Sequence, residues 1–288
     1  MKTSPLSRKC RDLLWILVLA LVLGVAVSAL RGYFALTVSC YTLTSDKLTE
    51  GIRVVHLSDL HNREFGPDNH RLLERVAEQK PDLIFVTGDC VTRNDPERQA
   101  ALELLGALTE LAPVYLSLGN HEVDYDQRYG TDLCALYRQT GVTVLNRAYA
   151  DITVNGQTVR VGGIYGYCYP TADSPEEGEF LREFAHTPRY TFLLCHRPVA
   201  WMERGALETW QVDSVYAGHA HGGQLRLPFI GSAIAPDQGL FPGWVEGVHY
   251  ARDGKRALVI SRGLGSSVFV PRVFNDPELV VVDILPAD

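Results

Sequence analysis

Cysteine and methionine are scarce in this chain of 288 residues, which holds 6 cysteines and 2 methionines. No two cysteines form a CxxC pair, which argues against a zinc site built on cysteine. Cys90 and Cys195 stand beside residues considered below as metal ligands, and strand alternation predicts that both thiols point away into the core. The sequence does not select a disulfide among the other four, which are Cys10, Cys40, Cys134 and Cys168.

An excess of basic residues is also missing, because the formal net charge is −7 at pH 7. Residues 1–12 carry four basic side chains against Asp12, so this segment is positive and the rest of the chain is more acidic than the total. An acidic domain has no surplus cations to neutralise phosphates along a polynucleotide. We therefore expect no nucleic-acid partner. The same charge would be repelled by anionic lipid headgroups unless something holds the domain at the membrane.

Charged residues are absent from Leu13–Leu30, which is apolar apart from Ser28. Its eighteen residues are close to the lower limit for a membrane-spanning helix. Basic residues precede the span and only Arg31 closely follows it, so the positive-inside rule predicts a single-pass protein of the cell membrane with an extracytoplasmic domain. The alternative is a cleaved signal peptide with Val27-Ser28-Ala29 as its small-residue site. The length favours the uncleaved anchor.

After the anchor, the pattern predicts one α/β domain. Apolar runs at Ile52–Leu57, Leu83–Val86 and Val114–Leu118 alternate with helical spacing at Arg71–Gln79 and Glu97–Leu111. This order is typical of a parallel sheet with right-handed crossovers. Shorter strands follow, with Asn155-Gly156 as a hairpin signal. We expect a two-sheet α/β sandwich preceded by one transmembrane helix. The predicted boundaries are a basic segment at 1–12, an anchor at 13–30, a connector at 31–50 and the domain at 51–288.

Metal-binding residue types follow the ends of five predicted strands. These pieces are Asp59-Leu60-His61, Gly88-Asp89, Gly119-Asn120-His121-Glu122, His196 and Gly218-His219-Ala220-His221. Side chains placed just beyond strand ends converge on one edge of a sheet. Asp59 and His61 are alternate residues, so an extended backbone would turn both toward one metal. Together the pieces supply two aspartates, one asparagine and four metal-binding histidines, a set that suits two divalent transition metals.

At these residues the chain resembles the calcineurin-like metallophosphoesterase superfamily. The order DxH, GDxxxR, GNHE, lone His and GHxH is complete, and the resemblance covers roughly residues 50–285. Gly222-Gly223-Gln224 and Ser261-Arg262-Gly263-Leu264-Gly265 are similar to the membrane-associated bacterial branch, which includes the YkuE-like and YaeI-like phosphodiesterases. Thr92 departs from the GDxxDR motif of the phosphoprotein phosphatases, which counts against that branch.

The resemblance implies two divalent ions (manganese, zinc or iron) that share a bridging hydroxide able to attack phosphorus. Asp89 would bridge the ions, and His121 would protonate the leaving group, oriented by Glu122 or another carboxylate. Arg93 would either clamp a phosphate oxygen or pair with a neighbouring carboxylate. The first ion would take Asp59, His61 and His221, and the second would take Asn120, His196 and His219.

The leading interpretation is a phosphodiesterase that hydrolyses a phosphate ester at the membrane or cell envelope, with lipid-linked esters among the candidate substrates. A pyrophosphatase-type hydrolase of a nucleotide-sugar lipid precursor is one alternative. A non-catalytic module of the same fold is another, but it predicts lost ligands and none is lost. Trp201, Phe229, Phe241 and Trp244 would either form an apolar rim near the membrane or have no such role. The sequence leaves the oligomeric state undetermined.

Overall fold

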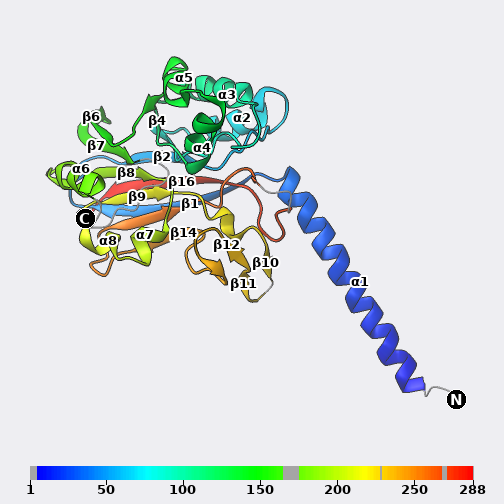
Figure 1. The fold of residues 1–288 in the computed structure, drawn as a ribbon. Coiled ribbons are helices and arrows are strands. Elements are labelled where there is room, and N and C mark those ends of the chain that lie inside the picture. The colour runs from blue at the N-terminus through cyan, green and yellow to red at the C-terminus, as the bar shows by residue number, and fades with distance from the viewer. Residues whose placement is uncertain (1–4, 165–174, 228, 268–270, 288) are drawn as a thin grey trace.

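A computed structural model of the chain describes residues 5–164, 175–227, 229–267 and 271–287. One long helix, α1 (Pro5–Phe34), projects from a two-sheet domain (Figure 1). At 1.5 Å per residue its 30 residues rise about 45 Å, more than the ~30 Å hydrocarbon thickness of a bilayer. Its apolar side chains are mostly exposed. By length and composition, α1 is therefore able to cross a membrane, and it includes the predicted span Leu13–Leu30.

The first sheet holds the strands that lead to the predicted site. Its strands, in spatial order, are β1 (Thr37–Ser45), β16 (Glu278–Pro286), β2 (Ile52–Leu57), β3 (Leu83–Val86), β4 (Val114–Leu116) and β5 (Thr143–Val144). The strands β2, β3, β4 and β5 are parallel, whereas β16 runs antiparallel to β2. The helices α2 (His70–Glu78) and α3 (Gln99–Thr109) provide the first two crossovers, within two residues of the predicted bounds.

Strand β1 corrects the predicted connector. All nine of its residues pair in parallel with β16, so this part of residues 31–50 belongs to the domain's sheet. The first residues of that segment, up to Phe34, complete α1. Among the residues of β1 only Leu43 is fully buried. The weak apolar pattern hid the strand because β1 covers an edge and keeps most of its side chains partly exposed.

The second sheet stacks on the first. Its strands, in spatial order, are β14 (Gly247–Tyr250), β15 (Ala257–Ile260), β9 (Ser214–Ala217), β8 (Thr191–Cys195), β7 (Gln157–Ile164) and β6 (Ala148–Val154). The strands β7, β8, β9 and β15 are parallel. Asn155 and Gly156 both have positive φ, at 47° and 76°, and join β6 to β7 as the predicted hairpin. Parallel strands in both sheets bring their carboxyl ends to the region of the predicted site.

Among the described residues, three large apolar cores separate four layers. The central core lies between the sheets, where the rings of Phe85 and Phe192 are 5.4 Å apart. The others lie beneath the helices that cover each outer sheet face. Burial of each large apolar side chain stabilises the fold by about 1.5–3 kcal/mol. The predicted two-sheet α/β sandwich is confirmed, as is the burial of Cys90 and Cys195 in these cores.

The remaining elements are short. They are α4 (Asn120–Tyr129), α5 (Leu133–Gln139), α6 (Pro175–Ala185), α7 (Val199–Met202), α8 (Ala206–Thr209), the 3-10 turns η1 (Pro67–Asn69) and η2 (His221–Gly223), and two small hairpins, β10 (Arg226–Leu227) with β11 (Gly231–Ser232) and β12 (Ile234–Ala235) with β13 (Gly239–Leu240). Asn69 directly precedes α2, but its side chain accepts from the amide of Phe65 and leaves the helix without a side-chain cap.

Candidate metal centre

The loops that follow β2 and β3 run side by side and carry three of the predicted ligands. The amide of Asp59 donates to the carbonyl of Gly88 at 3.0 Å, and that of His61 donates to Asp89 at 2.9 Å. The backbone is not extended here, because Asp59, His61 and Asp89 have φ of 54°, 51° and 52°. The two side chains do lie in one group, but the prediction that an extended backbone aligns them is wrong. The left-handed backbone conformations of Asp59 and His61 direct these side chains instead.

His219 and His221 share this backbone state, with φ of 65° and 49°. Five of the seven predicted ligand residues thus occupy a region that side chains other than glycine seldom adopt. Each such residue costs on the order of 1–3 kcal/mol and persists only where the surroundings hold it, as they do at functional sites.

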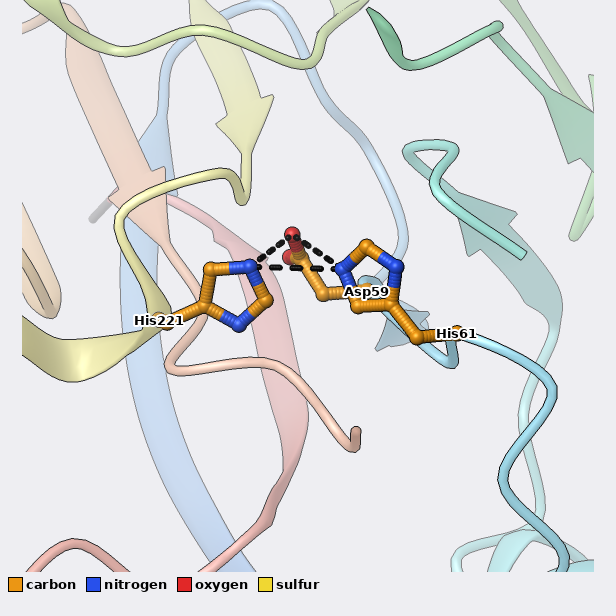
Figure 2. A group of neighbouring side chains, drawn as sticks. All are labelled: Asp59, His61 and His221. Atoms are coloured by element: carbon orange, nitrogen blue, oxygen red, sulfur yellow. Dashed lines mark hydrogen bonds and ion pairs between the residues drawn. The ribbon is translucent and has the colours of Figure 1, made fainter. Parts of the chain in front are cut away.

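Asp59, His61 and His221 form the first group of donors (Figure 2). The Nε2 atoms of His61 and His221 are 3.3 Å apart, and that of His221 is 3.5 Å from Asp59 Oδ1. Donor atoms about 2.0–2.1 Å from one ion would lie about 3.0–3.4 Å from each other. Burial lowers the pKa of His61 to about 3 and that of His221 to about 4. Both rings are therefore neutral near pH 7, the form that binds metal.

Asp89, His196 and His219 form a second group. Asp89 Oδ2 lies 3.2 Å from His196 Nε2 and 3.7 Å from His61 Nε2, so one carboxylate faces both groups. The carbonyl of Thr87 accepts from His196 Nδ1 at 2.6 Å, which turns Nε2 toward Asp89. Burial lowers the pKa of His196, but the charge and hydrogen bond of Asp89, together with Asp59 and the Thr87 carbonyl, raise it to about 9. The Asp89 carboxylate therefore favours a positive charge, either a proton or a cation, beside His196 Nε2.

Asn120 opens α4 beside Asp89. The amide of the next residue, His121, donates to Asp89 Oδ1 at 2.8 Å. Asn120 Oδ1 is buried and has no hydrogen-bond partner among the described residues. Leaving such an atom unsatisfied costs about 1–3 kcal/mol. Its position in a cluster of imidazoles and carboxylates fits a divalent cation, which would satisfy it.

Asp237 is a partner of this centre that the sequence analysis missed. Its Oδ2 lies 2.9 Å from His219 Nε2, so Nδ1 is the nitrogen that His219 has left for an ion. Arg197 Nε donates to the same oxygen at 2.7 Å. The hydrogen bond from His219, together with Arg197, lowers the pKa of Asp237 to about 2. Asp237 lies in the turn between β12 and β13, where its local sequence indicates only a turn.

His121 lies against the first group. Its ring meets the His61 ring edge-on at 4.5 Å, and its Nδ1 accepts from the amide of Arg93 at 3.0 Å. The Nε of Arg93 lies 3.2 Å from the other ring nitrogen. Burial lowers the pKa of His121, and the Arg93 charge lowers it further. Arg93 also forms an ion pair with Asp124, so of the two roles predicted for this arginine the carboxylate pairing is present.

Glu122 does not orient His121, which corrects one expectation. Its carboxylate accepts from the amides of Asp89, Cys90 and Gly119 at 2.7–2.8 Å, and from the Tyr137 hydroxyl at 3.2 Å. Burial and the nearby Asp89 charge raise the pKa of Glu122 to about 7. Glu122 therefore joins the loop after β3 to the start of α4, and it acts on the centre through the backbone.

Close backbone approach explains two of the motif glycines. A side chain at Gly119 would collide with the carboxylate of Asp89, and one at Gly218 would collide with Ser58 and Asp59. The motifs place glycine where the loops must pass against the ligand side chains.

A family model described as calcineurin-like phosphoesterase matches residues 52–223. The chain belongs to the calcineurin-like phosphoesterase family. A metallophosphoesterase of Aquifex aeolicus is 31% identical to this phosphoesterase over 92% of the chain and 97% of the relative. Phosphodiesterase YaeI of Escherichia coli is 33% identical over 81% and 82%, and metallophosphoesterase YkuE of Bacillus subtilis is 29% identical over 81% and 78%. These relatives confirm the superfamily and the bacterial branch.

The phosphoesterase is thus a metal-dependent hydrolase of phosphoric esters. Its fold uses two divalent metal ions, and the clustered potential ligands, which include a third group of His61, Asp89 and His121, fit that requirement. The donor set of imidazole, carboxylate and amide suits manganese, zinc or iron and does not select among them.

Proposed function

We propose that this phosphoesterase is a phosphodiesterase that hydrolyses a phosphate ester at the outer face of the membrane spanned by α1. The observation that carries the proposal is the pair of buried donor groups that both face the carboxylate of Asp89. The name of the relative YaeI, a phosphodiesterase, supports cleavage of diesters. The exposed apolar length of α1 supports attachment to a membrane, and a lipid-linked ester is the substrate class that suits such attachment.

We assign one ion to Asp59, His61 and His221. The other is assigned to Asn120, His196 and His219, with Asp89 between them. When bound, two such ions lower the pKa of water and neutralise charge on the phosphoryl oxygens. The chain's own contribution is to hold the donors in place, through the carbonyl of Thr87 for His196 and through Asp237 for His219.

We assign to His121 the protonation of the leaving oxygen. It lies beside both donor groups and is buried. In the free protein, burial and Arg93 lower its pKa, and the negative charge of a bound phosphate ester would oppose that effect. The amide of Arg93 donates to Nδ1, so we assign the transferable proton to Nε2. In this structure Arg93 Nε donates to Nε2 at 3.2 Å, and the arginine would have to release that contact for the ring to act as an acid. A direct contact of Arg93 with the phosphate stays a prediction.

Metal analysis and two parallel assays test this function. Protein purified without chelator should contain close to two divalent ions per chain, and with added manganese it should cleave bis-p-nitrophenyl phosphate faster than p-nitrophenyl phosphate. Asp89→Ala should lose both metal and activity, because one carboxylate serves both ions. Active protein with almost no metal would refute the two-ion centre. Faster cleavage of the monoester, or of a nucleotide-sugar pyrophosphate alone, would refute the diesterase assignment.

A further inference from the structure

The two small hairpins expose an apolar surface beside the metal centre. We call it the hairpin surface, and its members are Leu227, Phe229, Ile230, Ile234, Leu240 and Phe241. Phe229 is fully exposed, and Leu240 is 72% exposed. Large exposed apolar side chains gathered in one region mark interaction sites. Of the four aromatic residues considered from the sequence, Phe229 and Phe241 belong to this surface. Trp201 is buried and does not contribute to it, and Trp244 is partly buried against the outer core.

The backbone holds the two phenylalanines outward at a cost. Phe229 and Phe241 have φ of 67° and 53°, a region that bulky side chains avoid. Each such conformation costs on the order of 1–3 kcal/mol. In water, two exposed aromatic side chains on a strained backbone contribute no stabilising free energy. Burial of the two rings in another apolar phase would offset the conformational free energy of the strained backbone.

The hairpin surface carries no unpaired charge, although the domain is acidic. Within residues 225–241 the charged side chains are Arg226 and Asp237. Arg226 pairs with Glu246, and Asp237 turns inward to His219 and Arg197. The surface can therefore be removed from water without burying an unpaired charge. Burial of an unpaired charge would cost much free energy.

A single strip of chain links this surface to α1. On one side of the strip, the amide of Phe274 donates to Ser28 and the carboxylate of Asp276 pairs with Arg31 at 2.6 Å. On the other side, the amide of Arg226, which begins β10, donates to the carbonyl of Val273 at 3.0 Å. The hairpins are thus held next to the helix by main-chain and ion-pair contacts.

A second set of contacts fixes the outer end of α1 to the domain. Arg63 donates to the carbonyls of Gly32 and Tyr33, and Arg71 donates to that of Phe34 at 2.9 Å. These arginines satisfy carbonyls that the last turn of a helix leaves free. The domain therefore cannot swivel freely about α1. Figure 1 shows the hairpins on the side of the domain toward which α1 runs, while α2, α3 and α5 lie on the far side.

We propose that the hairpin surface rests in the interfacial layer of the bilayer that α1 spans. The proposal depends on the membrane attachment given under the proposed function, and it adds which face of the domain meets the lipid. Aromatic and aliphatic side chains bind this layer by burying apolar area about 5–10 Å into the boundary between headgroups and acyl chains. Because the turn of the second hairpin carries Asp237, the metal centre would lie close to the headgroup phosphates. The substrate class that follows is an amphipathic phosphodiester whose phosphate lies at the membrane surface.

Photo-crosslinking tests the lipid contact without requiring activity. The full chain is reconstituted in phosphatidylcholine–phosphatidylglycerol vesicles with a photoreactive phenylalanine analogue at position 229, 241 or 250. Tyr250 is the matched control, because it is a half-exposed aromatic residue on β14, beside Lys255 and Thr44 at the edge of the sheets opposite the metal centre. All three positions are exposed, so thermal melting should be unchanged.

The expected result is lipid adducts at 229 and 241 that exceed those at 250 by roughly ten-fold, as for a surface seated in the interface. Equal adducts at all three positions, or none at the hairpins, would overturn the proposal. Covalent dimers in place of lipid adducts would overturn it in favour of a second copy of the chain.

A paired activity assay separates this inference from the proposed function. Phe229→Ala combined with Phe241→Ala should leave cleavage of soluble bis-p-nitrophenyl phosphate unchanged. It should lower cleavage of a phosphodiester lipid embedded in vesicles by about ten-fold, because apolar contact area is lost. Equal effects on both substrates would count against the membrane contact. Lipid adducts from a protein that cleaves neither diester would refute the proposed function and leave the membrane contact standing.

Discussion

At the scale of single residues, the centre includes two imidazoles, those of His196 and His219, whose second nitrogen already has a partner. His196 donates to the carbonyl of Thr87, and His219 contacts Asp237, so in each ring one nitrogen is turned toward the cluster. Such outer partners set the tautomer and the orientation of a metal-binding histidine. Asp237 is therefore as much a part of the centre as the motif residues, although no motif contains it.

Replacement of Asp237 tests that role. Asp237→Asn keeps the shape of the side chain but removes the charge that faces His219, so we expect metal affinity to fall by about 10–100-fold. A chelator titration followed by metal analysis measures it. Asp253→Asn is the matched control, because Asp253 also pairs with an arginine, Arg256, but in the turn before β15. Equal metal retention in the two variants would show that Asp237 only supports the hairpin.

Replacement of His121 separates proton transfer from metal binding. His121→Ala should retain close to two ions per chain and lower turnover by roughly 10²–10⁴, the usual range for a positioned acid. The loss should shrink for p-nitrophenyl esters, because p-nitrophenolate leaves without protonation. Turnover of paired substrates with good and poor leaving groups checks this. Losses of the same size for both substrates would contradict the acid role.

At the scale of elements, apolar periodicity predicted the central strands and the first two helices well. It failed at α4, which was not expected. The buried residues of α4 are Asn120, His121, Glu122 and Tyr125. Three of these four are polar, because Asn120 and His121 face the metal centre and Glu122 binds the backbone of the loop after β3. The helix therefore buries its functional face and shows no apolar stripe. A method that searches for apolar stripes therefore overlooks helices built on a site.

The contribution of strand β1 to the stability of the domain can be tested with two shortened chains. A chain that begins at Leu36 removes α1 and keeps β1, whereas one that begins at Lys47 removes both. We expect the first to fold and the second to expose the β16 edge and lose the buried Leu43, a side chain worth about 2–5 kcal/mol. Thermal unfolding of the two soluble chains checks the difference. If both melt at the same temperature, β1 does not stabilise the domain.

At the scale of the whole molecule, orientation across the membrane is the main prediction. Four basic residues precede Leu13, so we expect a single-pass protein whose phosphoesterase domain lies outside the cell. Protease added to intact protoplasts should digest the domain while a cytoplasmic marker survives. Protection of the domain until lysis would reverse the orientation. A mature N-terminus near Leu30 would instead favour a cleaved signal peptide and a released enzyme.

The sequence by itself determined the donor residues, their order and the strands that precede them. Buried parallel strands need continuous apolar runs, and the predicted ligands follow directly where those runs stop, so both signals are local. The motif glycines are local too, because a side chain at Gly119 or Gly218 would collide with the ligand loops.

Only the tertiary structure decided how these residues meet. His61 and His221 are 160 positions apart, and the stacking of two sheets sets their 3.3 Å separation. The left-handed turns at Asp59 and Asp89, the Asp237 contact with His219 and the pairing of β1 all depend on distant segments. No local pattern encodes such contacts, because their energy arises only when residues far apart in the chain are packed together.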